Sequence, residues 1–279
     1  MIYTQFSVLI STYKNDDPLL FDLSFKSILN QSLPPTEIVL VIDGFIGPDL
    51  EKVICNYQNL YSASIKICRK EINSGLGNAL EYGLQYCSYE LVARMDTDDV
   101  AEYERFQKQI NFYNKHPETS VLGGWMMEFQ KTPGDIISKK TVPIENDKIK
   151  SYAKMRNPLN HPTVMFKKSD IIKAGSYKEI NLFEDYYLWL RVLKNGGIIS
   201  NVDDILLYFR IGNGLIERRH GYQYMLKEFK FFTRCFKEDL IPLQTYLLQI
   251  STRLPLRVMP RNLLKLIYKN FLRKTNPSS

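Results

Sequence analysis

Apolar strand-like runs alternate with helix-like segments over the first half of the chain, and this order restricts the fold more than any other feature. Buried-type strands are predicted at residues 6–12, 37–43, 64–69 and 90–96. Each is followed by a segment whose apolar residues recur at helical spacing. A β-α-β-α order of this kind predicts an α/β fold with a parallel, doubly wound sheet. Ligands of such sheets bind at the carboxyl ends of the strands, so functional side chains are expected there.

The second half is less regular, although it continues to mix strands and helices. The predicted elements are strands at 121–129, 162–168 and 205–211 and helices near 146–156, 183–196 and 218–236. No apolar run approaches the roughly 18 residues that span a bilayer, and the chain begins with a strand pattern rather than a signal peptide. The four cysteines show neither CxxC nor zinc-finger spacing, which favours a reduced, cytosolic compartment.

Charge is distributed unevenly along the chain. The formal net charge is +7, from 37 Lys and Arg against 30 Asp and Glu. Residues 240–279 hold seven basic residues and no acid, so residues 1–239 are formally neutral. A neutral body argues against a nucleic-acid partner, because such proteins carry basic residues over the whole domain. We therefore expect a globular domain at 1–239 and a basic tail with a separate role at 240–279.

Three acids follow the fourth predicted strand within four residues, namely Asp96, Asp98 and Asp99. Close carboxylates repel one another unless a cation lies among them, and hard oxygen ligands suit Mg²⁺ or Mn²⁺ shared with substrate phosphates. The alternative is that these acids only begin a helix, where the helix dipole favours negative charge. This segment alone does not separate the two interpretations.

Two other segments carry candidate chemistry. Residues 73–79 place a glycine turn at a helix start, which suits a phosphate but lacks the third glycine of a dinucleotide motif. A simple helix cap explains this turn equally well. Glu184 and Asp185 begin an apolar, aromatic helix. One interpretation gives them only a structural role, since the helix dipole stabilises acids at a helix start. Alternatively, the aromatic surroundings raise the pKa of one of them, which would make it a general base.

The two tryptophans, Trp125 and Trp189, fit either a core or a sugar-stacking surface.

The motifs taken together are more specific than any one of them. A strand ending in STY, a second ending in VIDG, the turn NSGLGNAL, the motif RMDTDD and a later ED helix occur in this order. The set resembles the inverting family 2 glycosyltransferases over about residues 5–215, and in particular bacterial transferases of O-antigen, capsule and exopolysaccharide assembly of the amylovoran-biosynthesis type. The resemblance implies a GT-A fold and transfer of a sugar from a UDP-sugar to a hydroxyl of a lipid-linked saccharide acceptor.

The resemblance also implies roles for residues that match the donor site. Thr12 and Tyr13 would line the nucleotide pocket, and Asp43 would bond the uracil. Gly75 and Asn78 would lie beside the nucleotide.

Further matching residues would surround the diphosphate. Arg94 would face it and Asp96 would contact the ribose. Asp98 would be the main carboxylate ligand of Mn²⁺ or Mg²⁺, assisted by Asp99. One departure concerns the histidine that many relatives place soon after the strand matching 205–211: this chain has Gly-Asn-Gly there, and His220 is a poor substitute.

On the acceptor side, the resemblance makes Asp185 the catalytic base and Glu184 the residue that places the acceptor. Gly124 and Trp125 would border the sugar site. The metal would act as a Lewis acid on the departing nucleoside diphosphate. A single displacement would invert the anomeric centre.

The basic tail contains an amphipathic pattern at residues 262–274. Lys265, Lys269 and Arg273 share one arc of a helical wheel, and apolar residues fill most of the rest. Such helices lie on anionic membranes, which with the resemblance predicts a peripheral protein on the cytoplasmic face of the bacterial inner membrane. The alternative is a helix packed on the body. Pro255 and a second proline at 260 are expected to interrupt the tail, giving at least two pieces.

Two other functions compete with glycosyl transfer. A nucleotidyltransferase is expected to have a glycine-rich basic loop after the first strand. Here that segment, STYKNDDP, contains Lys14 but no glycine. A catalytically inactive nucleotide-sugar-binding protein at the membrane surface is the other, and the presence of Asp43, Asp98 and Asp185 together argues against it. The donor sugar, the acceptor linkage and the oligomeric state do not follow from the sequence.

Overall fold

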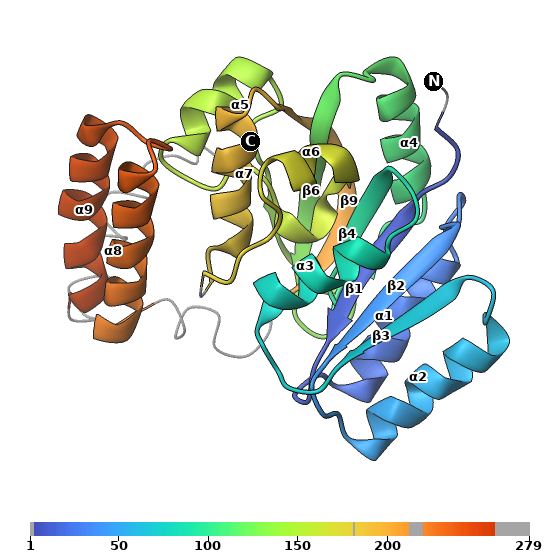
Figure 1. Ribbon diagram of the computed structural model, residues 1–279. Helices are drawn as coiled ribbons and strands as arrows, with labels where there is room; N and C mark the ends of the chain where they lie inside the picture. Colours follow the sequence, from blue (N-terminus) through green and yellow to red (C-terminus); the bar gives the residue numbers. More distant parts are fainter. Residues whose placement is uncertain (1–2, 181, 212–219, 260–279) are drawn as a thin grey trace. The chain divides into compact units, whose positions relative to one another are not determined.

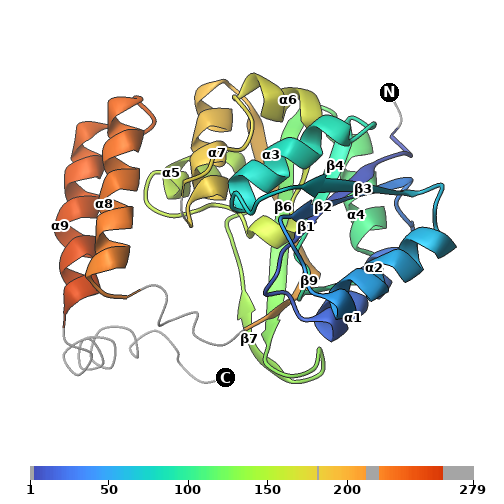
Figure 2. The same cartoon turned by 60° about the horizontal axis from the view of Figure 1, so that its bottom comes forward.

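The computed structural model describes residues 3–180, 182–211 and 220–259. The chain divides into two compact units, residues 1–211 and 212–279. The first unit is a sheet with helices packed on both faces, and the described residues of the second form two helices (Figures 1 and 2).

Four parallel strands form one half of the sheet, in the order β3-β2-β1-β4. Their bounds are β1 (Ser7–Thr12), β2 (Glu37–Asp43), β3 (Ile65–Lys70) and β4 (Leu91–Met95). Thr12 at the end of β1 pairs with Ile42, and Met95 at the end of β4 pairs with Ile10. The carboxyl ends of three neighbouring strands are therefore almost level, as the doubly wound prediction requires.

The other half of the sheet is mixed. β8 (Met165–Lys167) runs antiparallel between β4 and β6 (Thr119–Phe129), and β9 (Ile198–Arg210) runs parallel to β6. Two short strands complete the sheet, because β5 (Val100–Ala101) pairs with β9 and β7 (Ile136–Lys140) pairs with β6. The β5 pairing brings the segment after the acidic motif against β9.

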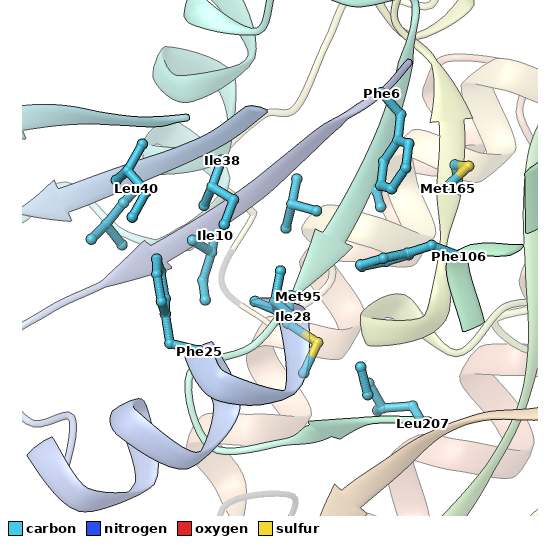
Figure 3. Close-up of a cluster of buried hydrophobic side chains, with 14 of the residues drawn as sticks. Phe6, Ile10, Phe25, Ile28, Ile38, Leu40, Met95, Phe106, Met165 and Leu207 are labelled. Atoms are coloured by element: carbon cyan, nitrogen blue, oxygen red, sulfur yellow. The ribbon is translucent and has the colours of Figure 1, made fainter. Parts of the chain in front are cut away.

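Alternate residues of the parallel strands serve two separate cores, which explains their continuous apolar runs. Ile10, Ile38 and Leu40 face one core with Phe25 and other residues of three helices, as Figure 3 shows. These helices are α1 (Pro18–Leu29), α2 (Pro48–Leu60) and α4 (Arg105–Lys115). The intervening residues, such as Leu9 and Val39, face a second core under the remaining helices. Those are α3 (Leu76–Tyr86), α5 (Asn146–Ala153), α6 (Lys168–Lys173) and α7 (Glu184–Lys194).

The structure corrects one predicted strand and extends another. The strand expected at 162–168 is reduced to β8, preceded by a 3-10 turn (His161–Thr163) and followed directly by α6. Pro162 lacks the N–H that a central strand needs, which explains the late start of β8. The strand expected at 205–211 begins at Ile198. Asp203 and Asp204 of this strand are exposed and lie where the register with β6 shifts. These two polar residues interrupt the apolar pattern, so residues 198–204 were not predicted as strand.

The second unit packs α8 (Tyr222–Lys237) against α9 (Leu243–Val258). Glu228 is 1% exposed and accepts hydrogen bonds from Arg253 and Arg257 of the opposite helix, at 3.2 and 2.8 Å. The expected interruption at Pro255 is wrong, because α9 continues through this residue. Pro255 lies in the last turn, so its missing N–H deprives only the carbonyl of the exposed Ser251 of a partner.

The predicted boundary between residues 239 and 240 lies in the loop that joins α8 to α9, whereas the units separate after Ile211. The difference arises because α8 packs on α9. The division of roles between 1–239 and 240–279 stays a prediction, and the amphipathic pattern at 262–274 lies outside the described residues. None of the helices within the described ranges has the length and apolar character needed to cross a bilayer.

Candidate active site

Thr12, at the end of β1, is fully buried, and Tyr13 is 40% exposed. The Thr12 hydroxyl donates a hydrogen bond to the Asp16 carboxylate at 2.8 Å, and the hydroxyl of Thr97 donates to the same oxygen at 2.8 Å. Sequence reasoning missed Asp16, although it follows a strand end by only four residues. It ties the β1 loop to the loop of the acidic motif, and burial with the nearby Asp96 raises its pKa.

Asp43, at the end of β2, is brought together with the glycine turn. Its carboxylate accepts hydrogen bonds from the backbone N–H groups of Ser74 and Gly75 at 3.0 and 3.1 Å and from the Ser74 hydroxyl at 3.1 Å. Lys70 lies 3.7 Å away. Asn78 donates its side-chain amide to the Ser74 carbonyl at 2.8 Å. Asp43 therefore shapes the predicted nucleotide loop, and its contact with a base stays a prediction.

The backbone requires glycine at position 75, because its φ is +92°, which L side chains rarely adopt. The carboxylate of the exposed Glu179 lies next to this glycine. The same carboxylate accepts the N–H of Gly77 at the start of α3. The N-terminus of α3, which the sequence suggested as a phosphate site, is thus capped by Glu179. Sequence reasoning did not connect this residue with the turn.

Arg94, the fourth residue of β4, forms an ion pair with Asp96, which directly follows the strand. The Arg94 side chain is 2% exposed and that of Asp96 is 31% exposed, so the pair extends from the interior to the surface of the site. The Asp96 carbonyl accepts the Ser24 hydroxyl of α1 at 2.7 Å, which fixes the loop. Arg94 is thereby directed at Asp96, and its predicted contact with a diphosphate is untested.

Asp98 and Asp99 are the acids whose environment favours a cation. Burial, with Asp96 and Asp16 nearby, raises the pKa of Asp98 to about 6. Asp99 is fully buried, and its pKa lies well above the ordinary value because of burial and the nearby Asp96 and Asp98. Its Oδ1 accepts the N–H of Arg210 at 2.8 Å, whereas Oδ2 has no hydrogen-bond partner among the described residues.

An unpartnered buried carboxylate oxygen fits the predicted Mn²⁺ or Mg²⁺, because a cation would supply the missing partner. Within residues 3–180, 182–211 and 220–259, no three His, Cys, Asp or Glu side chains are arranged to enclose a metal. A cation at Asp98 and Asp99 would therefore take further ligands from water or substrate, as Mg²⁺ commonly does.

Arg210 is a second residue that sequence reasoning did not assign. Its Nε–H donates to the Asp98 carbonyl at 3.0 Å, and its Nη1 donates to the carbonyls of Gln130 and Lys131 at 3.4 and 2.8 Å. It thus joins the acidic loop to the turn after β6. The glycines expected to replace a histidine lie outside the described residues. The His220 ring pairs with the Met259 carbonyl at 3.2 Å within the second unit.

Glu184 and Asp185 occupy the first turn of α7. Asn157 donates its amide to Asp185 Oδ2 at 2.6 Å, and the Tyr186 N–H donates to Oδ1 at 2.7 Å. Desolvation and the adjacent Asp185 raise the pKa of Glu184 to about 7. Desolvation also raises the pKa of Asp185, against the opposing effects of these hydrogen bonds and of Arg94. Asn157 precedes a proline in a loop, and nothing in the sequence marked it.

The two tryptophans have different environments. Trp189 is fully buried in the second core, so it is a core residue. Trp125 is half-buried on β6: its indole N–H donates to the Val142 carbonyl at 3.1 Å, and Lys139 Nζ lies 4.1 Å from its ring centre. The neighbouring Gly124 has Leu206 so close that a Cβ would lie 2.5 Å from it. Gly124 thus allows Leu206 of β9 to pack closely on the β6 backbone next to Trp125.

The chain resembles curated bacterial proteins over almost its whole length. It is 35% identical over 270 residues to an Escherichia coli protein named UDP-Gal:alpha-D-GlcNAc-diphosphoundecaprenol beta-1,3-galactosyltransferase, covering 97% of each chain. It is 39% identical over 227 residues to the amylovoran biosynthesis glycosyltransferase AmsE of Erwinia amylovora, covering 81% of this chain and 84% of AmsE.

Solved structures share its fold. Staphylococcus aureus TarS 1-349 in complex with UDP-GlcNAc aligns with a TM-score of 0.68 at 18% identity, over 98% of this chain and 76% of TarS. The mannosyltransferase PcManGT of Pyrobaculum calidifontis, in complex with GDP-Man and Mn²⁺, aligns with a TM-score of 0.64 at 13% identity, over 99% of this chain and 76% of PcManGT. The fold is the expected GT-A fold.

The profile described as Glycosyl transferase family 2 matches residues 7–180, which run from β1 to the loop before α7. This range includes the strand ends, the glycine turn and the acidic motif. The family profile covers more than half of the chain. The similarity to the Escherichia coli relative spans 97% of the chain and so extends over α7 and β9 as well. The chain belongs to glycosyltransferase family 2.

Proposed function

We propose that this glycosyltransferase moves a sugar from a UDP-sugar to a hydroxyl of a polyprenyl-diphosphate-linked saccharide, with inversion and with Mn²⁺ or Mg²⁺, in bacterial surface polysaccharide synthesis. One observation carries the proposal. The buried charge of Arg94 acts on two groups of acids with raised pKa, Asp98 and Asp99 after β4 and Glu184 and Asp185 on α7. Both groups are therefore within electrostatic reach of the same buried guanidinium, which supports a single centre where a leaving group and an attacking hydroxyl could meet.

Asp185 is suited to take a proton from the acceptor hydroxyl. Its two oxygens are oriented by the Asn157 amide and the Tyr186 N–H. A carboxylate whose pKa is raised is a more effective base near neutral pH than an ordinary aspartate. Attack from the face opposite the departing diphosphate inverts the anomeric carbon, so an α-linked UDP-sugar would give a β-linked product.

Asp98 and Asp99 would hold the metal. Bound there, Mn²⁺ or Mg²⁺ would supply Lewis acidity toward the nucleoside diphosphate. The unpartnered Oδ2 of Asp99 supports this assignment. The presence of Mn²⁺ beside GDP-Man in PcManGT, a protein of the same fold, supports it further.

The lipid-linked acceptor is supported by the name of the Escherichia coli relative, which includes a GlcNAc-diphosphoundecaprenol acceptor. Such an acceptor places the enzyme at a membrane, and the basic residues from 240 onward suit an anionic surface. We place the enzyme on the cytoplasmic face of the inner membrane as a peripheral protein. Deletion from residue 240 should release it from anionic liposomes, and a full-length protein that ignores such liposomes would contradict this placement.

A screen of UDP-sugars tests the function directly. The purified full-length protein is incubated with each UDP-sugar, with and without Mn²⁺, and with a synthetic sugar diphosphate lipid, followed by linkage analysis. We expect one donor to give a β-linked product only when metal is present. Nucleotide-sugar binding without any transfer would favour the inactive binding protein, and release of pyrophosphate from a nucleoside triphosphate would favour a nucleotidyltransferase.

A further inference from the structure

One short segment, residues 157–164, lies between α5 and β8 and contacts three elements of the candidate site. It contains two prolines and the 3-10 turn (His161–Thr163), which restrict its backbone. Its hydrogen bonds lead to three predicted site residues, namely Asp185 of α7, Gly124 of β6 and Arg94 of β4. The segment therefore joins the proposed base to the predicted edge of the sugar site and to the arginine predicted to face the diphosphate.

The first half of the segment holds the base and the sugar edge. Asn157 donates its amide to Asp185 Oδ2 at 2.6 Å, and Asn160 donates its amide to the Gly124 carbonyl at 3.0 Å. The Thr163 hydroxyl donates to the Asn160 carbonyl at 2.7 Å and accepts the Gly124 N–H at 3.1 Å. Both backbone groups of Gly124 are thus bound to the segment. A shift of this part of β6 would displace the segment that holds Asp185.

The end of the segment is tied to β4 and its start to β9. The Val164 carbonyl accepts the N–H of Arg94 at 2.9 Å. The Asn201 side chain, which is 1% exposed, donates its amide to the Pro158 carbonyl at 3.1 Å. Buried hydrogen bonds of this kind are costly to break, because the separated groups are left without partners away from water. The segment is therefore a fixed frame rather than an adaptable loop.

The amide of Asn157 has a defined orientation. The Leu159 N–H donates to Asn157 Oδ1 at 3.3 Å, which leaves the NH2 group for the Asp185 carboxylate. A reversed amide would place oxygen against oxygen at Asp185 and NH2 against N–H at Leu159. Asn157 therefore presents a hydrogen-bond donor to Asp185, and a donor stabilises the ionised form of a carboxylate.

Charged groups from three elements also act on Asp185. The adjacent Glu184 of α7 disfavours a second negative charge, whereas Arg94 of β4 and Lys140 of β7 favour the ionised form. Asn157 differs from these groups because it is neutral and directly hydrogen-bonded. Its effect on the base can therefore be removed by Asn157→Ala without altering the net charge of the site.

We propose that residues 157–164 position the reacting groups of this transferase. Asn157 holds Asp185 as the proton acceptor for the acceptor hydroxyl, and the rest of the segment holds Gly124 and Arg94 at fixed places relative to that base. The proposal rests on the function proposed above. Transfer needs the attacking hydroxyl and the leaving group at a defined separation, and small misplacements lower the rate strongly. A rigid segment bonded to both sides of the reaction supplies that separation.

The test at the base compares Asn157→Ala with Asn157→Asp, which keeps the shape of the side chain but replaces the donor by a second carboxylate. The acidic limb of the pH profile of kcat/KM reports the pKa of the base in the free enzyme. Loss of the donor should move this limb to higher pH by about one unit in Asn157→Ala. Like charge should move it further in Asn157→Asp. Asn111→Asp, which changes an exposed asparagine on α4, should leave the profile unchanged.

The other end of the frame has a different readout. Asn160→Ala removes the donor to Gly124 but leaves Asp185 its partner, so KM for the UDP-sugar should rise by about tenfold while the acidic limb stays in place. Thermal unfolding of each variant separates a folding defect from a kinetic one.

Two results would overturn the proposal. An acidic limb that stays in place in both Asn157 variants, or one that shifts equally in Asn160→Ala, would mean that the segment only supports the fold. Metal-dependent transfer by the wild-type enzyme would still stand in either case, so failure here is distinct from failure of the proposed function.

Discussion

Two buried aspartates near the carboxyl ends of parallel strands, Asp43 as the last residue of β2 and Asp99 in the loop after β4, have opposite surroundings. Asp43 accepts hydrogen bonds from two backbone N–H groups and a hydroxyl of the glycine turn. Asp99 accepts one backbone N–H on Oδ1 and nothing on Oδ2 from the described residues. The same residue type at the same kind of position therefore does two things. Asp43 holds a loop in shape, whereas Asp99 keeps an unpartnered oxygen and a raised pKa, and a bound cation would relieve both.

The difference separates the donor side of the site from the reacting centre. Around Asp43, satisfied hydrogen bonds make the glycine turn a rigid part of the fold. Around Asp98, Asp99 and Glu184, buried or half-buried acids with raised pKa make the fold less stable than it could be. Substitutions on the two sides should therefore have opposite effects on stability and unequal effects on activity.

The largest effect on activity is expected at the base. Asp185→Asn keeps the hydrogen-bonding shape of the side chain but cannot accept the acceptor proton, so transfer should fall by about 10³-fold or more. Binding of UDP, measured by calorimetry, should persist because Asp185 lies outside the donor loops. Asp147→Asn, an exposed acid on α5, serves as the control. Near-normal turnover by Asp185→Asn would remove the residue from the reaction.

Loss of the metal should have the next largest effect. A chelator is expected to abolish transfer, and added Mn²⁺ or Mg²⁺ to restore it. Asp98→Asn should lower kcat/KM by about 10²-fold and raise the metal concentration needed for half-maximal rate. Asp203→Asn changes an exposed acid on β9 and should leave the metal titration unchanged. A chelator without effect on the wild-type enzyme would contradict the metal site.

The sequence could predict the acids at strand ends because a parallel sheet aligns those ends, and the structure makes β1, β2 and β4 neighbours. It could not predict what the acids contact. The partners of Asp43 are backbone N–H groups 31 and 32 residues away, and those of Asp99 and Asp185 come from Arg210 and Asn157. Such partners carry no local pattern, because they are determined by tertiary packing.

The same limit explains the missed elements. β7 has five residues of which four are exposed, so neither burial nor alternation marked it as a strand. Asp16 was hidden among the polar residues of a loop, yet it joins Thr12 to Thr97. Trp189 could not be separated from a sugar-stacking residue until its complete burial was known.

A stability measurement tests the donor side of the comparison. Asp43→Ala would leave the N–H groups of Ser74 and Gly75 without their acceptor inside the protein, at a cost of about 2 kcal/mol. Asp43→Asn keeps one acceptor oxygen and should cost less. Chemical denaturation of both variants, with exposed Asp49→Ala as control, checks the order. If Asp43→Ala is as stable as the wild type, the hydrogen bonds seen at this turn do not hold it.

The smallest expected effect lies at Glu184 and has the opposite sign. Its pKa is raised to about 7 by desolvation and by Asp185, so the folded state retains a proton that the unfolded state loses near pH 4.5. Stability therefore falls as pH rises from about 4.5 to about 7. Glu184→Gln removes this loss, so the variant should be more stable than the wild type at pH 8 but not at pH 4. The expected gain in the free energy of unfolding is only about 1 kcal/mol, because the Glu184 side chain is half-buried and partly screened by solvent. Equal stability of the two proteins at pH 8 would mean that the surroundings of Glu184 do not disfavour its charged form. The contrast between a stabilising acid at the donor loop and a destabilising acid at the reacting centre would then no longer extend to α7.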